Sequence, residues 1–440
     1  MKDVNAKRKI VILGGGFGGL YAIQALKSTD VDLILIDKVN YHLFQPLLYQ
    51  VATAALAPRD IAIPFRKILK KQKNLSVILG EVTRVDKEQK VVYLNSGETI
   101  NYDALVIAIG VAPSYYGRQE WREHARAIKT IPDALSLRDK ILMSLEKAHQ
   151  TSDVSKRQAY LNFIVIGGGP TGVEMAGAVA ELVHFSIKNY FNTIDPLSCT
   201  PRVILLEAAP RILGAFPEYL SLEGQKSLNS LKVQVITNAH VNEITEGGVL
   251  VNDHFIPSKN VIWSAGNTGT SLVQSLNTPL DQMNRVIVNP DLTIPHCPDL
   301  FVIGDAAHCK DKKGIPLPGV APVAIQQGKY IGSILKKDYS SGQRPAFEYF
   351  DKGAMAMIGK GKAIARVGKL QISGFLAWLA WSFIHIFYLI GFHNRIFVLL
   401  EWLWWICTGA RGNYLIYKEE EMKENLSKSE VKIPLENVKL

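Results

Sequence analysis

The chain has 440 residues, of which 48% are hydrophobic and 20% charged, and its formal net charge is +10. This length predicts two or three domains, and the composition excludes an intrinsically disordered chain. A basic excess suits nucleic acid, an anionic membrane or an anionic small ligand. We find no Lys/Arg run and no nucleic-acid-binding module, so nucleic acid is set aside as a partner.

The four cysteines, at positions 199, 297, 309 and 407, match neither a redox dithiol nor a metal site in their spacing. We expect reduced thiols, as in a reducing cytosol, with a disulfide between Cys297 and Cys309 as the alternative. No apolar stretch precedes residues 9–13, so no signal peptide is expected. The sequence therefore predicts a protein without a metal that stays in the compartment where it is made.

A dinucleotide-binding unit opens the chain. Residues 9–13 (KIVIL) predict a buried parallel strand, and GGGFGG (14–19), a helical pattern and a second strand ending at Asp37 follow. Gly14 permits the tight turn, Gly16 lets a pyrophosphate approach the backbone, and Gly19 allows close packing of helix on strand. The helix N-terminus favours phosphate, and Asp37 is placed to accept hydrogen bonds from a ribose.

The same unit recurs downstream. The strand FIVIG (163–167) leads into GGGPTG (167–172), a helix, and the strand VILLE (203–207) that ends at Glu207. Residues 184–201, a helix extension and a turn at Asp195-Pro196, account for the longer distance between glycines and acid. Glu207 would repel a 2′-phosphate, which favours NAD over NADP, and Arg211 weakens that preference slightly.

The third motif is the strand DLFVIGDAA (299–307), in which Gly304-Asp305 opens a helix. At this point the sequence resembles the flavoproteins that have two dinucleotide-binding domains. The resemblance implies that the first glycine loop binds FAD, that the second binds NADH, and that Gly304-Asp305 returns the chain to the FAD. Disulfide reductases need a dithiol near residues 40–52, which contain no cysteine, so that chemistry is excluded.

Further segments narrow the family. HLFQPLLYQVA (42–52), GGGPTGVEMAGA (167–178), LLEAAPRIL (205–213), APVAIQQG (321–328) and GAMAMIGKGKAIA (353–365) strongly resemble type II NADH dehydrogenases, the single-subunit NADH:quinone oxidoreductases. The likeness covers about residues 7–417. It implies electron transfer from NADH through FAD to a membrane quinone without proton pumping. The quinone's identity and the oligomeric state stay open, with a homodimer as one option.

The predicted fold is α/β, with two Rossmann-like dinucleotide-binding domains and a C-terminal membrane-associated helical region. The FAD domain is discontinuous because the NADH domain is inserted into it. We expect residues 1–115 and 291–345 to form the FAD-binding domain, 116–290 the NADH-binding domain, 346–417 the membrane-anchoring region, and 418–440 a charged, disordered tail.

The resemblance also implies site residues. Those expected at the FAD are Gly14, Gly16, Phe17, Gly18, Gly19, Asp37, Val82, Ala108, Gly110, Gly304, Asp305 and Ala321. Those expected at the NADH are Gly167, Gly169, Thr171, Gly172, Glu207 and Gly266.

Two residues are expected in catalysis. Glu174, in the first turn after the second glycine loop, matches an acid that the family places near the flavin, and its structural alternative is a carboxylate at a helix N-terminus. The quinone-side motif AQxAxQ is altered here, because Pro322 replaces the first Gln and has no donor. Gln326 alone would then bind a quinone carbonyl.

Several nearby residues have two interpretations of comparable standing. Tyr49 and Gln50 either line the acceptor side of the flavin or pack in the core. His42 is a possible proton donor, but a hydrogen-bonded structural histidine is the favoured interpretation. Lys360 and Lys362 either neutralise a reduced flavin or lipid phosphates or face solvent.

The C-terminal third carries two apolar runs. Residues 374–392 contain no formal charge and as a helix would span ~28 Å. Residues 396–410 are shorter, and Glu401 interrupts them, so they should not span. Trp402, Trp404 and Trp405 suit a membrane interface. Because basic residues flank both runs, we expect 374–410 to lie as a monotopic anchor on the cytoplasmic face of the inner membrane, with one crossing helix as the alternative.

Two rival functions share part of this pattern. A sulfide:quinone oxidoreductase shares the fold and the membrane end but needs two closely placed catalytic cysteines, and Cys297 and Cys309 flank the Gly304-Asp305 strand instead. A nucleotide-binding flavoprotein without turnover is the second rival, against which Glu174 and the intact second glycine loop argue.

Overall fold

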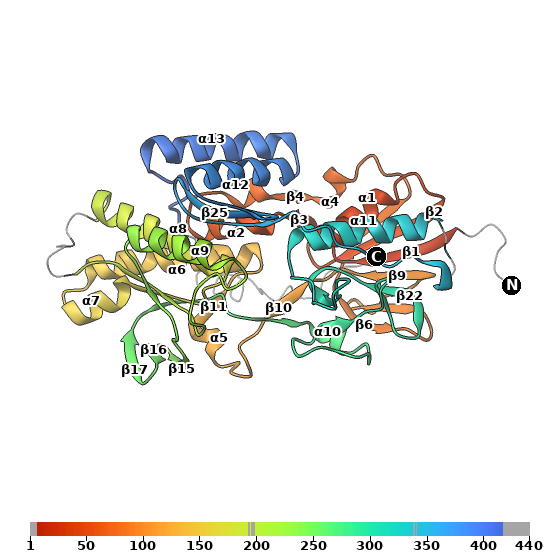
Figure 1. Ribbon diagram of the computed structural model, residues 1–440, viewed down its shortest axis with the longest axis horizontal. Helices are drawn as coiled ribbons and strands as arrows, with labels where there is room; N and C mark the ends of the chain where they lie inside the picture. Colours follow the sequence, from red (N-terminus) through yellow and green to blue (C-terminus); the bar gives the residue numbers. More distant parts are fainter. Residues whose placement is uncertain (1–6, 192–193, 195–198, 338, 340, 417–440) are drawn as a thin grey trace, which may run out of the picture.

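The computed structural model describes residues 7–191, 194, 199–337, 339 and 341–416. Two mainly parallel sheets lie side by side, and a C-terminal layer with two helices lies on one side of the molecule (Figure 1). The expected tail 418–440 and the turn at Asp195-Pro196 fall outside the described residues. The predicted α/β fold with two Rossmann-like units is confirmed.

The first sheet is built from both ends of the nucleotide-binding region. Its strand order is β21-β22-β9-β1-β2-β5, with bounds β21 Thr293–Ile294, β22 Cys297–Val302, β9 Ala104–Ile107, β1 Arg8–Leu13, β2 Val31–Asp37 and β5 Leu75–Leu79. All pairs except β21–β22 are parallel. Helices α1 (Phe17–Ala25) and α11 (Ala321–Lys337) pack against each other beside it. The first domain is therefore discontinuous, as expected.

The second sheet lies between these two parts in sequence. Its order is β11-β18-β12-β13-β14, all parallel, with bounds β11 Ala125–Ala127, β18 Asn260–Trp263, β12 Asn162–Ile166, β13 Arg202–Leu206 and β14 Val233–Ile236. Its helices are α6 (Ile131–Gln150), α8 (Pro170–Asn189) and α9 (Glu218–Ser230). Strand β12 is buried at every position, as a central parallel strand requires.

Residues 267–276 contact the first domain. Strand β19 (Asn267–Gly269) pairs with β10 (Val111–Pro113), and these two strands connect the domains. Beyond them, Leu272, Val273 and Leu276 share a hydrophobic cluster with Val11 and Leu13 of β1. We therefore propose that the second boundary lies near residue 266, because the core contacts of 267–290 are made with the first sheet.

The C-terminal layer combines a small sheet with a helix pair. Strands β24 (Ala354–Gly359), β25 (Lys362–Val367) and β26 (Leu370–Gly374) are antiparallel and pack on α8 and α9. Helices α12 (Phe375–Tyr388) and α13 (Phe392–Thr408) follow. The run 374–392 thus breaks after Tyr388, where Leu389 is extended. Among the described residues, no helix is long and apolar enough to cross a membrane.

Shorter elements complete the chain: β3 Tyr41–Leu43, α2 Leu48–Ala52, α3 Pro58–Ile61, β4 Ala62–Pro64, α4 Phe65–Ile68, β6 Val82–Asp86, β7 Val91–Leu94, β8 Thr99–Asn101, α5 Trp121–His124, α7 Val154–Leu161, β15 Val241–Thr245, β16 Gly248–Val251, β17 His254–Pro257, α10 Ser271–Gln274, β20 Val286–Ile287 and β23 Ala307–His308.

Candidate functional site

The first glycine loop has the backbone that its sequence predicts. Gly14 has φ +90°, and a Cβ there would stand 2.6 Å from Ala108 O. A Cβ at Gly19 would stand 1.9 Å from Gly14 O, so helix α1 approaches β1 as only glycine allows. A Cβ at Gly16 would meet no atom closer than 4.0 Å. The space in front of the N-terminus of α1 is therefore open to a phosphate.

Asp37 braces this loop from the end of β2. Its Oδ2 accepts a hydrogen bond from Gly15 N at 2.6 Å, and Oδ1 accepts one from Val39 N at 2.9 Å. Burial raises the pKa of the Asp37 carboxyl, and these two N–H donors oppose the shift. The carboxylate thus holds the loop in shape, in addition to the predicted contact with a ribose.

The other residues expected at the first site converge on it. Ala108 and Gly110 follow β9, the strand that pairs with β1. Gly304 follows β22, which pairs with β9 on its other side. Burial raises the pKa of Asp305, and the positive charge of Lys129 opposes that shift. Ala321 begins α11. Phe17 is the first residue of α1, and Gly18 faces Ile303. Val82 begins β6. It comes just after Gly80, whose N–H donates to Asp37 O.

The second glycine loop repeats this geometry. Gly167 has φ +106°, and a Cβ at Gly172 would stand 1.8 Å from Gly167 O. A Cβ at Gly169 would meet no atom within 4 Å. Glu207 Oε2 accepts a hydrogen bond from Gly168 N at 2.6 Å, and Oε1 accepts one from Ala209 N at 2.7 Å. This second cradle also leaves phosphate space at a helix N-terminus.

The rim of the second cradle is formed by the strand next to β12. Ser264, which follows β18, donates its hydroxyl to Ile166 O and Gly167 O at 2.8 and 3.0 Å. Gly266 has φ +79°, and a Cβ there would stand 2.5 Å from the Tyr116 hydroxyl. Thr171 is exposed in the first turn of α8. Ser264 was not expected from the sequence, which offers no motif for it.

Glu174 lies where α8 meets the C-terminal layer. Its Oε1 accepts a hydrogen bond from Met357 N of β24 at 3.3 Å. Burial raises the pKa of the Glu174 carboxyl to about 8, against the smaller opposing effects of the Met357 N–H and the Trp381 side chain. No hydrogen bond of ordinary geometry joins Trp381 to Glu174 within the described chain. Glu174 is therefore mostly protonated at neutral pH, a property that the helix-dipole interpretation does not predict.

Gln326 bonds the backbone of a neighbouring segment. Its Nε2 donates to Phe350 O, and its Oε1 accepts from Phe350 N, both at 3.0 Å. Its amide thus fixes the chain at Phe350, and the bond from Gln326 to a quinone carbonyl stays a prediction. The neighbouring Gln327 is buried, and its Oε1 accepts from Gly304 N at 2.6 Å. Pro322 is at the second position of α11, where no N–H is needed.

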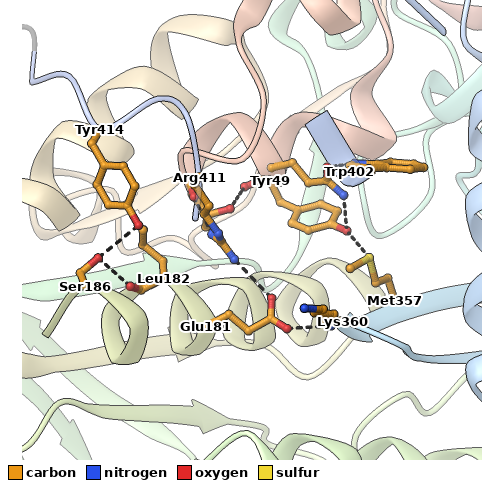
Figure 2. Close-up of polar contacts among 11 residues, drawn as sticks. Tyr49, Glu181, Leu182, Ser186, Met357, Lys360, Trp402, Arg411 and Tyr414 are labelled. Carbon is orange, nitrogen blue, oxygen red and sulfur yellow. Dashed lines mark hydrogen bonds and ion pairs between the residues drawn. The ribbon is translucent and has the colours of Figure 1, made fainter. Parts of the chain in front are cut away.

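A polar network ties the end of the C-terminal layer to the nucleotide domains (Figure 2). Arg411, which follows α13, donates to Glu181 Oε2 at 3.2 Å and to Thr53 O at 2.5 Å. Glu181 Oε1 also accepts from Lys360 N at 2.6 Å. The Arg411 side chain is 3% exposed and that of Glu181 is 14% exposed, so this ion pair is buried. Lys360 Nζ donates to Ile406 O at 2.5 Å, which makes this lysine a structural link.

A second branch of the network joins α2 to α13. Trp402 Nε1 donates to Gln50 Oε1 at 2.8 Å, and Gln50 Nε2 donates to the Tyr49 hydroxyl at 3.1 Å. The Tyr49 hydroxyl donates to Met357 Sδ at 3.3 Å, so Tyr49 and Gln50 are core residues beside Glu174. Lys362 bonds the Ser230 hydroxyl.

The outer faces of α12 and α13 are apolar. Large exposed side chains there are Phe375, Leu376, Leu379, Phe383, Ile384, Phe387, Phe392, Ile396, Phe397, Leu399, Leu400, Leu403 and Trp404. Trp402 and Trp405 are buried instead, because they lie on the inner face of α13. Burial removes these two from the predicted set of interfacial tryptophans, and for Trp404, which is 60% exposed, the interfacial position stays a prediction.

The remaining candidates are structural. His42 Nδ1 bonds Gly15 O at 2.9 Å, and burial lowers the pKa of its imidazole, so it supports the first loop. Cys297 and Cys309 are free thiols, and burial raises the pKa of Cys309 to about 11. Neither the alternative disulfide nor a reactive thiolate is present at these positions, which argues against sulfide oxidation.

The two cradles and their parallel sheets define a pyridine-nucleotide flavoprotein. A family model described as pyridine nucleotide-disulphide oxidoreductase matches residues 8–328. The type II NADH:quinone oxidoreductases Ndh and NdhA of Mycobacterium tuberculosis are 41% and 40% identical to this chain, over 94% of it and 91% and 90% of their own lengths. The structure of NDH2 from Plasmodium falciparum in complex with NADH matches with a TM-score of 0.85, at 21% identity, over 93% of this chain and 100% of that one. The chain belongs to the type II NADH:quinone oxidoreductases, which confirms the resemblance found in its motifs.

Proposed function

We propose that this protein takes hydride from NADH and reduces a membrane quinone through bound FAD, without proton pumping. The observation that carries the proposal is the pair of glycine cradles in one chain, with Glu174, which bonds Met357 N, between the second cradle and the C-terminal layer. This is the activity of the family to which the chain belongs.

The first cradle fits FAD and the second fits NADH. A Cβ at Gly16 or Gly169 would occupy the space that a pyrophosphate needs, and each loop is braced by an acidic side chain. We assign the FAD to Gly14–Gly19, Asp37 and Gly304-Asp305, and the NADH to Gly167–Gly172 and Glu207. When bound, the flavin supplies a two-electron relay between hydride donor and acceptor.

Glu174 is proposed to be the proton donor to the quinone. Reduction of a quinone to a quinol takes up two electrons and two protons, and the hydride of NADH carries two electrons and one proton. One further proton is needed. The Glu174 carboxyl, whose pKa is about 8, holds that proton at pH 7 and can recover it from water.

The exposed apolar faces of α12 and α13 are proposed to rest in the lipid interface. Phe383 and Leu376 are each 69% exposed, and Phe392 is 79% exposed, on neighbouring helices of one layer. A contiguous apolar surface of this kind suits a monotopic membrane contact. We propose the cytoplasmic face of the inner membrane, where NADH is available and the quinone diffuses in from the bilayer. We propose a homodimer as the oligomeric state of the protein.

Steady-state turnover tests the proposed function. Purified protein that retains its flavin should oxidise NADH in the presence of a soluble quinone analogue, and sulfide should not replace NADH. Ferricyanide serves as an acceptor that needs no specific pocket. Protein that contains flavin but does not couple NADH oxidation to quinone reduction would contradict the proposal.

Flotation with lipid vesicles tests the membrane contact separately. Phe383→Glu combined with Leu403→Glu should abolish flotation, because charges on the lipid-facing side oppose insertion. The matched control is Leu222→Glu combined with Phe255→Glu, which changes exposed apolar residues of the second domain and should float as the unmodified protein does. Equal flotation of both variants would contradict the assignment of the surface.

A further inference from the structure

The inner face of α12 carries polar atoms without partners. Trp378, Trp381, Ser382 and His385 follow one another at helical spacing, so they share a face of the helix. Within the described part of the chain, the indole N–H groups of Trp378 and Trp381 and the hydroxyl of Ser382 are buried and make no hydrogen bond. Each such group costs about 1–3 kcal/mol, so several together indicate a polar ligand on this face.

The hydrogen bonding of His385 fixes which of its nitrogens can meet a ligand. His385 Nδ1 lies 2.7 Å from Trp381 O. A carbonyl oxygen only accepts, so Nδ1 carries the hydrogen and Nε2 carries the lone pair. Burial lowers the pKa of the His385 imidazole to about 4, so the ring is neutral at pH 7. Nε2 therefore acts as a hydrogen-bond acceptor.

The surroundings of His385 connect it to both redox sites. Its ring stacks on Trp381 with centroids 4.0 Å apart, and the Trp381 side chain acts on the Glu174 carboxyl. The opposite neighbour is Phe44, 6.2 Å away edge to face, which in turn contacts Phe17 of the first glycine loop at 5.7 Å. His385 thus stands between the proposed proton donor and the FAD cradle, on the helix whose outer face meets lipid.

We propose that His385 accepts a hydrogen bond from the hydroxyl of the quinol, and that it makes the site favour the reduced form of the substrate. A quinone carbonyl has no hydrogen to give to an accepting Nε2, whereas a quinol hydroxyl has one. This inference rests on the proposed function and assigns His385 a role in distinguishing product from substrate.

Two substitutions separate the two nitrogens. In a His385→Asn variant, the side-chain amide nitrogen takes the place of Nδ1 and can still donate to Trp381 O, while nothing replaces Nε2. In a His385→Gln variant, the amide reaches the place of Nε2 and its oxygen can accept. His393→Asn, an exposed histidine on α13, is the matched control.

The measured quantities are the inhibition constant of the quinol and the KM of the quinone, for protein in detergent. In His385→Asn the quinol constant should rise about tenfold, the effect of one hydrogen bond, while the quinone KM changes less than about twofold. His385→Gln should recover most of the quinol affinity, and His393→Asn should match the unmodified protein. Flavin content and reduction of the flavin by NADH should be unchanged in all three.

An unchanged quinol constant in His385→Asn would overturn the proposal, and so would a parallel rise of both constants, which indicates loose packing. If that variant does not fold, the unmodified protein can be tested with two inhibitors, the quinol and its dimethyl ether. The ether has no hydroxyl hydrogen, so it should inhibit about tenfold more weakly than the quinol. Equal inhibition by the two would overturn the proposal. Failure of the proposed function would appear differently, as unmodified protein that reduces no quinone at all.

Discussion

The two glycine cradles have nearly the same geometry and different surroundings. In each, the first glycine has positive φ, the last glycine lies under the oxygen of the first, and an acidic side chain accepts a 2.6 Å hydrogen bond from the second glycine. The strands that flank them also correspond, since β9-β1-β2 and β18-β12-β13 are equivalent triplets. The same loop conformation therefore occurs twice in the chain, as the binding of two dinucleotides requires.

The helices that follow the cradles differ. Helix α1 has nine residues and is covered by α11, where a Cβ at Gly328 would stand 2.2 Å from Gly18 O. Helix α8 has 20 residues and is covered by β24, where a Cβ at Gly177 would stand 1.7 Å from Ile358 O. Of these two helices, only α8 carries carboxylic acids whose pKa is raised, Glu174 and Glu181, on the side of the C-terminal layer. The second cradle, unlike the first, is followed by a helix that the C-terminal layer covers.

The largest expected effect comes from filling the cradles. Gly16→Val should abolish flavin binding, because the side chain would occupy the pyrophosphate position, and the purified protein should be colourless. Gly169→Val should keep the flavin and raise the KM for NADH on the order of a hundredfold. Absorbance spectra and NADH kinetics check both. Flavin retained in the first variant, or lost in the second, would reverse the assignment.

The next effect concerns the buried ion pair. Arg411→Met should lower the free energy of unfolding by about 3–5 kcal/mol, because Glu181 would stay buried without its partner. Adding Glu181→Gln should restore part of the loss. Denaturant unfolding measures both variants, with Arg118→Met, in an exposed pair, as the control that should change little. A small loss in Arg411→Met would show that this link does not hold the layers together.

Glu174→Gln should reduce quinone turnover by about a hundredfold, the usual contribution of a general acid, while flavin content stays the same. In the unmodified protein, turnover should fall as the pH rises through about 8, where the Glu174 carboxyl loses its proton. The variant should lack this alkaline limb. A pH profile with the same limb in both proteins would contradict the role of Glu174.

The same shift predicts the pH dependence of stability. Folding raises the pKa of Glu174 from 4.5 to about 8, so between these values the folded state binds more protons than the unfolded one. This group therefore makes the free energy of unfolding fall as the pH rises across that interval. Glu174→Gln should show a smaller fall, measurable by thermal unfolding at pH 6 and about pH 8.5.

The smallest effect is expected at Glu207, the acidic residue that bonds the second glycine loop. Glu207→Gln can keep one of the two backbone hydrogen bonds at Gly168 and Ala209, so it should cost about 1 kcal/mol and leave the flavin bound. Removal of the negative charge should also narrow the preference for NADH over NADPH. An unchanged ratio of kcat/KM for the two nucleotides would mean that Glu207 only shapes the loop.

The local part of this structure could be predicted from the sequence. Both glycine units, their acidic residues and the discontinuous first domain follow from short motifs, because backbone geometry near a glycine depends on few neighbours. The contact of Gln327 with Gly304 could not be predicted, because the rotation of α11 about its own axis decides which of two adjacent glutamines faces Gly304.

The long-range part could not be predicted. Arg411 and Glu181 are 230 positions apart, and no periodicity connects them. The break after Tyr388 could not be predicted from an uninterrupted apolar run either, since it depends on the packing of α12 on the small sheet and of α13 on α3. The domain boundary that we propose near residue 266 depends in the same way on the contacts of Leu272 and Val273.

The most direct test is an anaerobic half-reaction of the purified, flavin-loaded protein. One equivalent of NADH should bleach the flavin absorbance, and one equivalent of a soluble quinone should restore it, because the two cradles hold the donor and the relay in one chain. A flavin that stays oxidised with NADH, or that quinone does not reoxidise, would contradict the account.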